Sequence, residues 1–181
     1  MITIKNGYIL EGKSLVKKDL YIENGKIIKI EDELEVLGEV VDALGGFIMP
    51  GATDVHVHLR EPGFSYKETI KTGTMASVKG GVTTCLAMPN LRPCPDSLAN
   101  LAVEEELINK DAVCHVYPYG AVTVNQEDKV LANIDEYHDQ VYAITDDGRG
   151  VNNMELLESA MKKALKYDIF YICEVALWQT E

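Results

Sequence analysis

The sequence lacks the features of a membrane or secreted protein. No uninterrupted apolar run approaches the ~20 residues that a membrane-spanning helix needs. The start, MITIKNG, lacks the charged-then-apolar pattern of a signal peptide. Cysteine is scarce, and the four cysteines are never spaced as C-x-x-C, which argues against a structural zinc site built on thiolates. Because free thiols are typical of a reducing compartment, we expect a cytoplasmic chain with no membrane partner.

Basic residues are also few. The chain has 17 lysines and arginines against 29 aspartates and glutamates, a formal net charge of −12. An acidic surface repels phosphate backbones, so this balance argues against a nucleic-acid partner. The remaining composition, 46% hydrophobic and 25% charged over 181 residues, is that of a globular chain and excludes a disordered or collagen-like one.

The first fifty residues have the texture of a small, mostly antiparallel β unit. Short β-type runs are separated by glycines and by Asn24-Gly25, and Asn-Gly is the strongest short hairpin signal. The dipeptide Pro50-Gly51 closes this region. The expected strands cover residues 3–5, 8–10, 20–23 and 26–30, with further strand-like pieces at 40–41 and 47–49.

From residue 51 the pattern alternates between strands and helices, which predicts βαβ units and a parallel sheet. The first helix is expected to open at a capping box formed by Ser65 and Glu68 and to end at Gly80-Gly81. Further helices are expected to begin at residue 96 or 97, to cover about 126–136, and to begin at residue 152 or 153, the last with apolar residues at 157, 160, 161 and 164. The expected strands are 52–59, 82–88, 112–117, 141–145 and 169–173.

The strongest chemical signal lies at the end of the first of these strands, where residues 54–63 read DVHVHLREPG. Side chains at positions 54, 56 and 58 share one face of a strand because the strand period is two. Two imidazoles on one face can hold one divalent metal, and neutral imidazole suits zinc, with carboxylates completing the shell. A bare H-x-H also fits two strand-end histidines bonded to backbone, so the pattern alone leaves both interpretations open.

Further polar groups follow the ends of other strands. The run DDG at 146–148 ends the fourth strand, Asn90 follows the second, and Arg60 follows the two histidines. Asp-Gly alone also fits a turn or a helix cap. However, the carboxyl ends of parallel strands meet at one rim, where a carboxylate can bind or bridge metals. Arginine offers a planar fork that suits a carboxylate, and asparagine offers donors and an acceptor, so the three positions together predict one shared site.

These motifs resemble the amidohydrolase superfamily, specifically the bacterial-type dihydroorotases. H-x-H alone is typical of the whole superfamily, whereas the run HLREPG at 58–63 narrows the resemblance to dihydroorotases and allantoinases. The run TDDG at 145–148 narrows it further, because hydantoinases and allantoinases usually carry a carboxylated lysine there. The MPN turn at 88–90 with Arg92-Pro93 also matches. The resemblance extends from the IKNG run at 4–7 to about residue 168.

The resemblance implies a zinc-dependent cyclic amidohydrolase of pyrimidine biosynthesis, which reversibly hydrolyses the small-molecule substrate dihydroorotate to N-carbamoyl-aspartate. It implies that His56 and His58 bind one or two zinc ions and that Asp147 is the bridging carboxylate. It also implies that Arg60 and Asn90 hold the substrate carboxylate. The zinc-bound water would attack the ring carbon, and the proton would pass through a catalytic aspartate that the family carries beyond the equivalent of residue 181.

The chain also departs from the family pattern. The family's next ligands are a histidine ending strand five, commonly in a His-Cys-Glu run, and another on strand six; here residues 172–174 read Ile-Cys-Glu. His115 is expected to be a satisfied core residue within a strand and His138 to lie in a polar loop before a strand, so neither is assigned as a ligand. We therefore expect a truncated chain with an incomplete second metal site and no activity of its own.

The fold implied by the resemblance is α/β: a TIM-barrel-type metal-dependent hydrolase joined to a small β-sandwich-like unit. Residues 51–181 would form the first half of the (β/α)8 barrel, about five βα units, and residues 1–50 the N-terminal part of the sandwich. A complete barrel needs about 250 residues, and an open half-barrel exposes strand edges, which favours homo-oligomers or low stability. Two alternatives stay open, a hydantoinase- or allantoinase-type cyclic amidase and a non-catalytic dihydroorotase-like partner subunit.

Overall fold

The structure, a computed structural model, describes residues 1–173 of the chain. The chain divides into two compact units, Met1–Pro50 and Gly51–Glu181, and the division falls at the Pro-Gly pair of residues 50 and 51. Residues 174–181, which belong to the second predicted domain, lie outside the described residues. In the part that the structure describes, no helix is both long enough and apolar enough to cross a membrane.

The first unit is a four-stranded sheet with the order β3-β2-β1-β4. The pairs β1–β2 and β2–β3 are antiparallel and β1–β4 is parallel, so the prediction of a mostly antiparallel unit is confirmed. The predicted Asn24-Gly25 turn connects β2 to β3, and both residues have the positive φ that a tight hairpin needs. The strands are β1 (Ile2–Glu11), β2 (Ser14–Glu23), β3 (Lys26–Glu31) and β4 (Glu39–Asp42).

Two strand predictions in this unit were wrong in detail. The runs 3–5 and 8–10 are one continuous strand, β1, whose register against β2 shifts between Ile4 and Gly7. The piece at 47–49 forms no strand and contributes only a single bridge between Tyr8 and Phe47. Gly7 therefore marks an irregularity inside one strand and not a break between two strands.

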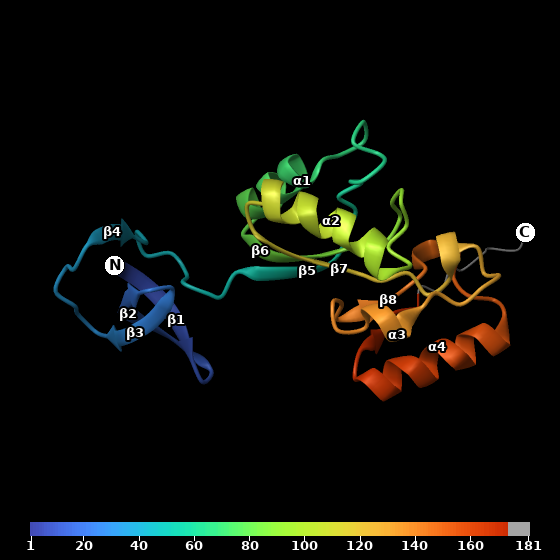
Figure 1. Cartoon of the computed structure of the whole chain (residues 1–181). Coiled ribbons are helices and arrows are strands. Elements are labelled where there is room, and N and C mark those ends of the chain that lie inside the picture. The colour runs from blue at the N-terminus through green and yellow to red at the C-terminus, as the bar shows by residue number, and fades with distance from the viewer. Residues whose placement is uncertain (174–181) are drawn as a thin grey trace, which may run out of the picture. The chain divides into compact units, whose positions relative to one another are not determined.

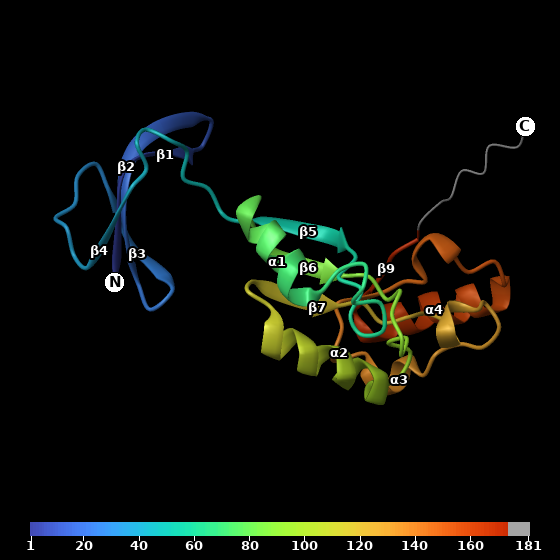
Figure 2. The same ribbon diagram turned by 90° about the horizontal axis from the view of Figure 1, so that it is seen from above.

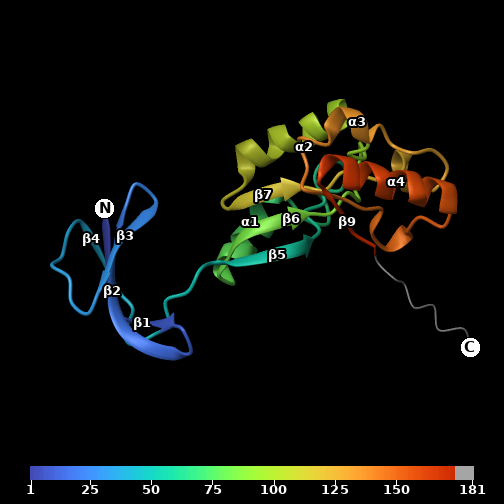
Figure 3. The same ribbon diagram turned by 90° about the horizontal axis from the view of Figure 1, so that it is seen from below.

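The second unit has the predicted α/β pattern. Strands β5, β6 and β7 form a parallel sheet in chain order, and Figure 3 shows their three arrows side by side. Strands β8 and β9 form a second parallel pair, and a parallel bridge between Gly120 and Ile144 connects the segment after β7 to β8. These strands are β5 (Ala52–Val57), β6 (Val82–Ala87), β7 (His115–Pro118), β8 (Ala143–Ile144) and β9 (Phe170–Tyr171).

The helices pack against the sheet and form the buried cores of the second unit. Helices α1 and α2 pack on one face of β5–β7, where Leu59, Ile70, Cys85 and Val116 form the buried core between them. A second core lies around Tyr137 and joins α2, α3, β8 and α4. Figure 2 shows β5 and β6 pointing towards the part that carries α4. The helices are α1 (Ile70–Lys79), α2 (Leu98–Asp111), α3 (Ile134–Tyr137) and α4 (Met154–Tyr167), with short 3-10 turns η1 (Val124–Gln126) and η2 (Asp147–Arg149).

The start of α1 differs from the prediction. Thr69 and Thr72, and not Ser65 and Glu68, form the capping box, so the helix begins at Ile70. Glu68 instead accepts hydrogen bonds from the Thr69 backbone and the Thr72 hydroxyl, contacts that lower the pKa of its carboxyl. The later helices begin as predicted, because Ser97 caps α2 and Asn153 caps α4.

The predicted helix with apolar residues at 157, 160, 161 and 164 is confirmed as α4, in which Ala160 and Ala164 are buried and Met161 is 54% exposed. Two further predictions were wrong. The expected helix over 126–136 is replaced by η1, a loop and the single turn α3. His115 lies on β7 as expected, yet its side chain is exposed and not part of the core. The sequence pattern correctly predicted that His115 lies on a strand. It did not predict that the His115 side chain lies on an exposed face of the sheet.

Glu104 on α2 is a buried carboxyl with a testable effect on stability. Only 2% of the residue is exposed, its Oε2 has no hydrogen-bond partner among the described residues, and burial raises the pKa of its carboxyl well above 4.5. The folded state holds the Glu104 proton more tightly than the unfolded state does. The neutral carboxyl therefore contributes its full stability below the unfolded pKa, and this contribution is lost as the pH rises through the folded pKa.

We expect Glu104→Gln to remove this pH dependence. The amide stays neutral, so the variant should be more stable than the parent at pH 7, and its stability should fall less steeply above pH 4.5. Each pH unit between the unfolded and folded pKa of Glu104 is worth about 1.4 kcal/mol. Urea unfolding between pH 4.5 and 8 measures the difference; parallel curves for the two proteins would contradict it.

Candidate metal centre and adjoining pocket

The two histidines of the H-x-H motif meet at the carboxyl end of β5. His56 is on the strand and His58 follows it, so both side chains leave the same face, and their Nε2 atoms lie 3.4 Å apart. Leu59 then enters the core with 2% of its surface exposed, and Arg60 turns the chain with a φ of 64°. This buried leucine fixes the strand end and therefore the position of both imidazoles.

Asp147 reaches the same point from the end of β8. It starts η2 with a φ of 54°, and its backbone N–H donates to the Thr145 hydroxyl at 2.9 Å. Its Oδ1 lies 3.3 Å from His56 Nε2. One ligand atom from each of His56, His58 and Asp147 lies within 4.8 Å of the other two. Such a set of two imidazoles and a carboxylate can hold a divalent metal.

The chemistry of these three side chains fits a bound metal ion. Asp147 Oδ1 is buried and accepts no hydrogen bond among the described residues. A buried carboxylate oxygen without a hydrogen bond is costly unless a cation compensates it. The neutral imidazoles and this carboxylate are the ligand types that zinc takes in catalytic sites.

The neighbouring Asp146 has a different task. It is 2% exposed, and its two oxygens accept hydrogen bonds from the backbone N–H groups of Val122 and Thr123 and from the Thr123 hydroxyl, at 2.5 to 3.1 Å. Burial raises the pKa of its carboxyl, and these hydrogen bonds oppose the rise. Asp146 therefore ties the segment after β7 to the segment that carries Asp147.

A pocket of about 590 Å3 is lined by residues that lie close in sequence to the histidines and Asp147. Its walls continue the same segments, since Arg60 follows His58 by two residues and Arg149 follows Asp147 by two. The loop after β6 contributes Asn90, whose Oδ1 is buried and accepts no hydrogen bond among the described residues. The lining residues are Arg60, Phe64, Lys67, Asn90, Leu91, Arg92, Pro93, Cys94, Asn125, Gln126, Glu127 and Arg149.

The loops after β5 and β6 are packed tightly together, which fixes the Arg60 wall. Gly63 has a φ of 95°, and a Cβ there would overlap the backbone carbonyl of Arg92. Arg92 in turn donates its N–H to the Pro62 carbonyl at 3.1 Å. Glu61 accepts a hydrogen bond from the Ile70 backbone at 2.9 Å, which joins the loop to the first turn of α1.

The pocket is electropositive although the chain is acidic. Four of its lining residues are cationic, and Glu127 is its one carboxylate among the described residues. The Phe64 ring has cations near it, with Lys67 Nζ 5.7 Å and Arg92 Cζ 5.9 Å from its centroid. A small cavity with this charge favours an anionic ligand. Burial raises the pKa of the Cys94 thiol to about 12, so this lining residue is not an additional anion at neutral pH.

The structure clusters three of the five site residues named from the sequence, His56, His58 and Asp147, and places the other two, Arg60 and Asn90, in the wall of the pocket. Their roles stay predictions. Sequence reasoning did not identify Lys67, Gln126 or Arg149 as pocket residues.

Solved structures of hydantoinases resemble this fold. The L-hydantoinase (dihydropyrimidinase) of Arthrobacter aurescens superposes with a TM-score of 0.81 at 18% identity, over 94% of this chain and 39% of that one. A D-hydantoinase from Thermus sp. superposes with a TM-score of 0.58 at 33% identity, over 68% of this chain and 28% of that one. The first likeness concerns the fold alone, which supports the α/β prediction.

Curated relatives cover almost all of the chain. The dihydroorotase of Bacillus cytotoxicus is 43% identical over 175 residues, which is 94% of this chain and 41% of the relative. The dihydroorotase of Fusobacterium nucleatum subsp. nucleatum is 41% identical over 164 residues, 90% of this chain and 39% of the relative. The chain thus spans about two fifths of the length of these relatives. The family model described as dihydro-orotase-like matches residues 45–176, and the chain belongs to this dihydro-orotase-like family.

Proposed function

We propose that this chain carries the metal-binding part of a dihydroorotase, a zinc-dependent cyclic amidohydrolase that reversibly hydrolyses dihydroorotate to N-carbamoyl-aspartate in pyrimidine biosynthesis. One observation carries the proposal: the two segments that supply the His56–His58–Asp147 cluster also supply walls of an electropositive pocket, which Arg60 and Asn90 line. The dihydroorotases that match 90% or more of the chain support the same substrate. The four free thiols fit a cytoplasmic location.

His56, His58 and Asp147 would hold zinc, as one ion or as the first part of a two-ion site. When bound, zinc supplies Lewis acidity toward an amide carbonyl and acidifies water at neutral pH. The histidines come from the end of β5 and Asp147 from the segment after β8, so two separate segments would hold the metal. The Asp146 hydrogen bonds hold the second of these segments in place.

Arg60 and Asn90 would bind and orient the substrate. The planar guanidinium suits a carboxylate, and the Asn90 amide can donate to it from the neighbouring loop. The tight packing of Gly63 on Arg92 holds these two loops against each other. We assign no general acid–base residue among the described residues of this site.

We place residues 51–181 as the first half of a (β/α)8 barrel, about five βα units, and residues 1–50 as the N-terminal part of a composite β-sandwich. The parallel order β5-β6-β7 with helices on one face supports the barrel. Both units would be completed by chain equivalent to the remaining three fifths of the relatives. The exposed apolar side chains on β3 and β4, such as Ile27 and Val40, are consistent with a missing second layer.

The function can be tested in a chimera. We expect that replacing the matching N-terminal part of the Bacillus cytotoxicus dihydroorotase with this chain gives an enzyme that hydrolyses dihydroorotate. The variant Arg60→Met in that chimera should lower kcat/KM by about 10- to 150-fold, the value of a hydrogen bond to a charged group. The purified 181-residue chain should show no turnover even with excess zinc.

A panel of dihydroorotate, hydantoin and allantoin separates the alternatives. The hydantoinase-like solved structures favour the second of these substrates, whereas the dihydroorotase relatives favour the first. A folded, zinc-loaded chimera that prefers hydantoin or allantoin would contradict the proposal. Co-purification of the chain with a full-length dihydroorotase, without activity in any chimera, would favour a non-catalytic partner subunit.

A further inference from the structure

Gln126 is a buried amide that lines the pocket without a partner. The residue is 6% exposed, and its Nε2 is buried with no hydrogen-bond partner among the described residues. Burying an unsatisfied amide donor costs free energy, and replacing it with an apolar group of similar shape is neutral or stabilising. Folding stability therefore does not explain the amide group at this position.

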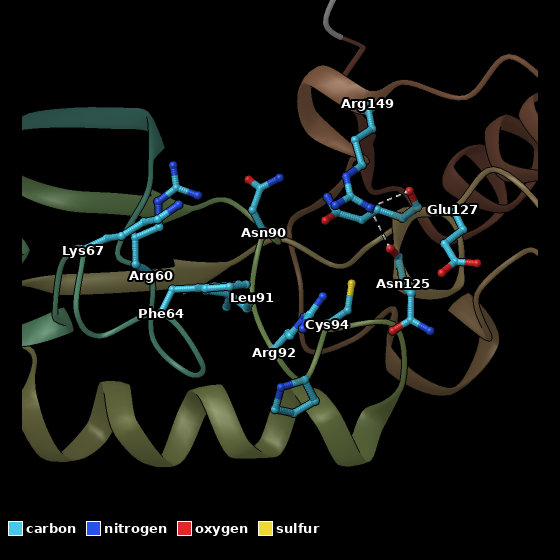
Figure 4. A pocket seen from close by; sticks show the side chains of 12 residues that line it. Arg60, Phe64, Lys67, Asn90, Leu91, Arg92, Cys94, Asn125, Glu127 and Arg149 are labelled. Atoms are coloured by element: carbon cyan, nitrogen blue, oxygen red, sulfur yellow. Dashed lines mark hydrogen bonds between the residues drawn. The ribbon is translucent and has the colours of Figure 1, made fainter.

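The backbone around Gln126 is strained and firmly held. Asn125, Gln126 and Asp128 have φ values of 54°, 56° and 56°, which are uncommon for residues other than glycine. Asp96 Oδ2 accepts from the Asn125 N–H at 2.9 Å, and Arg149 donates to the carbonyls of Asn125 and Gln126 at 3.2 Å (Figure 4). Strain maintained by surrounding contacts is typical of ligand-binding segments.

The other polar groups of the pocket define the ligand. Figure 4 shows Asn90 between Arg60 and Lys67 on one side and Arg149 on the other. Asn90 Oδ1 is a buried acceptor that lacks a donor, and Gln126 Nε2 is a buried donor that lacks an acceptor, both among the described residues. The cations require a negative charge. A ligand that satisfies all three conditions is an anion that also carries an N–H and a carbonyl oxygen.

We propose that Gln126 is a further ligand-binding residue of this site, one that recognises the ureido group of a ureido acid. Its Nε2 donates to the ureido carbonyl oxygen, while Asn90 Oδ1 accepts the ureido N–H and the cations bind the carboxylate. This inference rests on the proposed function, because N-carbamoyl-aspartate is a ureido acid and dihydroorotate is its cyclic form. It adds a donor that distinguishes ureido acids from simple dicarboxylates.

Calorimetric titration of the metal-free 181-residue chain tests the inference. The probes are N-carbamoyl-aspartate and succinate, which has two carboxylates and no ureido group. We expect the chain to bind N-carbamoyl-aspartate more tightly than succinate. Gln126→Met should weaken N-carbamoyl-aspartate binding by about three- to tenfold, the value of one hydrogen bond, and leave succinate binding unchanged. Gln126→Glu should weaken it further, because a carboxylate replaces the donor.

A thermal melt separates binding from folding. Gln126→Met should have a Tm equal to or above that of the parent, because it removes an unsatisfied buried donor. The matched control is Gln140→Met, at an exposed glutamine outside this pocket, which should leave both affinities unchanged. Four results would each overturn the inference: no binding by the parent chain, no loss in Gln126→Met, an equal loss for both probes, or a loss accompanied by a lower Tm.

The outcome is independent of turnover. Ureido-acid binding that depends on Gln126, together with inactive zinc-loaded chimeras, would leave the inference standing and remove the proposed function. Dihydroorotate hydrolysis by the chimera, together with unchanged ureido-acid affinity in Gln126→Met, would leave the proposed function standing and remove the inference about Gln126.

Discussion

Replacing both His56 and His58 with alanine is expected to lower the zinc affinity of the chain by at least about 100-fold, since changes to residues that only support a ligand already cost 10- to 100-fold. Two of the three clustered ligand atoms are lost, and a single carboxylate holds zinc weakly. Folding stability should change little, because the His56 side chain is 39% exposed. Competition with a chromophoric zinc chelator measures the affinity.

His115 provides the control for this pair. It is an exposed histidine on β7 that is not part of the cluster, so His115→Ala should bind zinc as the parent does. Equal zinc affinity in the parent and the double variant would show that the metal binds elsewhere. A loss in His115→Ala of similar size would contradict the assignment of the ligands.

Replacing Asp146 with alanine is expected to destabilise the metal-free chain by about 3 kcal/mol or more. The substitution leaves the buried N–H groups of Val122 and Thr123 and the Thr123 hydroxyl without their acceptor, and each such loss costs about 1–3 kcal/mol. The carboxylate's own burial offsets part of this sum, because burial raises its pKa. Urea unfolding at pH 7 measures the difference.

Asp147→Ala is the matched control because it changes the adjacent residue of the same motif. Its buried oxygen accepts no hydrogen bond among the described residues, so the metal-free variant should unfold within about 1 kcal/mol of the parent. Zinc affinity should follow the opposite order, with a large loss in Asp147→Ala. Greater destabilisation by Asp147→Ala than by Asp146→Ala would refute this division of roles.

The two aspartates illustrate what the sequence could predict. The spacing placed both at the end of a strand, and the family resemblance singled out Asp147, but no pattern gave the physical difference between them. That difference arises because the chain enters the left-handed region at Asp147, with a φ of 54°. One carboxylate is thereby directed to the amides at residues 122 and 123 and the next to His56.

The alternation of strands and helices from residue 51 was predictable because it depends on local period and capping residues. The H-x-H pair was predictable for the same reason, since side chains two apart share a face of β5. The loop at 123–128 was not. Its polar residues resemble a weak helix, whereas tertiary hydrogen bonds from Asp96 and Arg149 hold it in a strained non-helical form. Gln126 therefore could not be recognised as a pocket residue.

The burial of Glu104 was equally unpredictable from the sequence. It lies among the polar residues of an amphipathic helix, and local periodicity assigns a glutamate there to solvent. Its burial depends on the tertiary packing of α2, which local periodicity does not encode. The exposed position of His115 is the opposite case, because a strand in a half-covered sheet has one bare face.

X-ray absorption at the zinc edge of the zinc-loaded chain tests the metal centre most directly. We expect two imidazole ligands with oxygen donors completing the shell and no sulfur, and loss of the imidazole signal in the double histidine variant. A first shell that contains sulfur, from Cys94 or another thiol, or one with oxygen donors alone, would contradict the central claim that His56, His58 and Asp147 form the metal site.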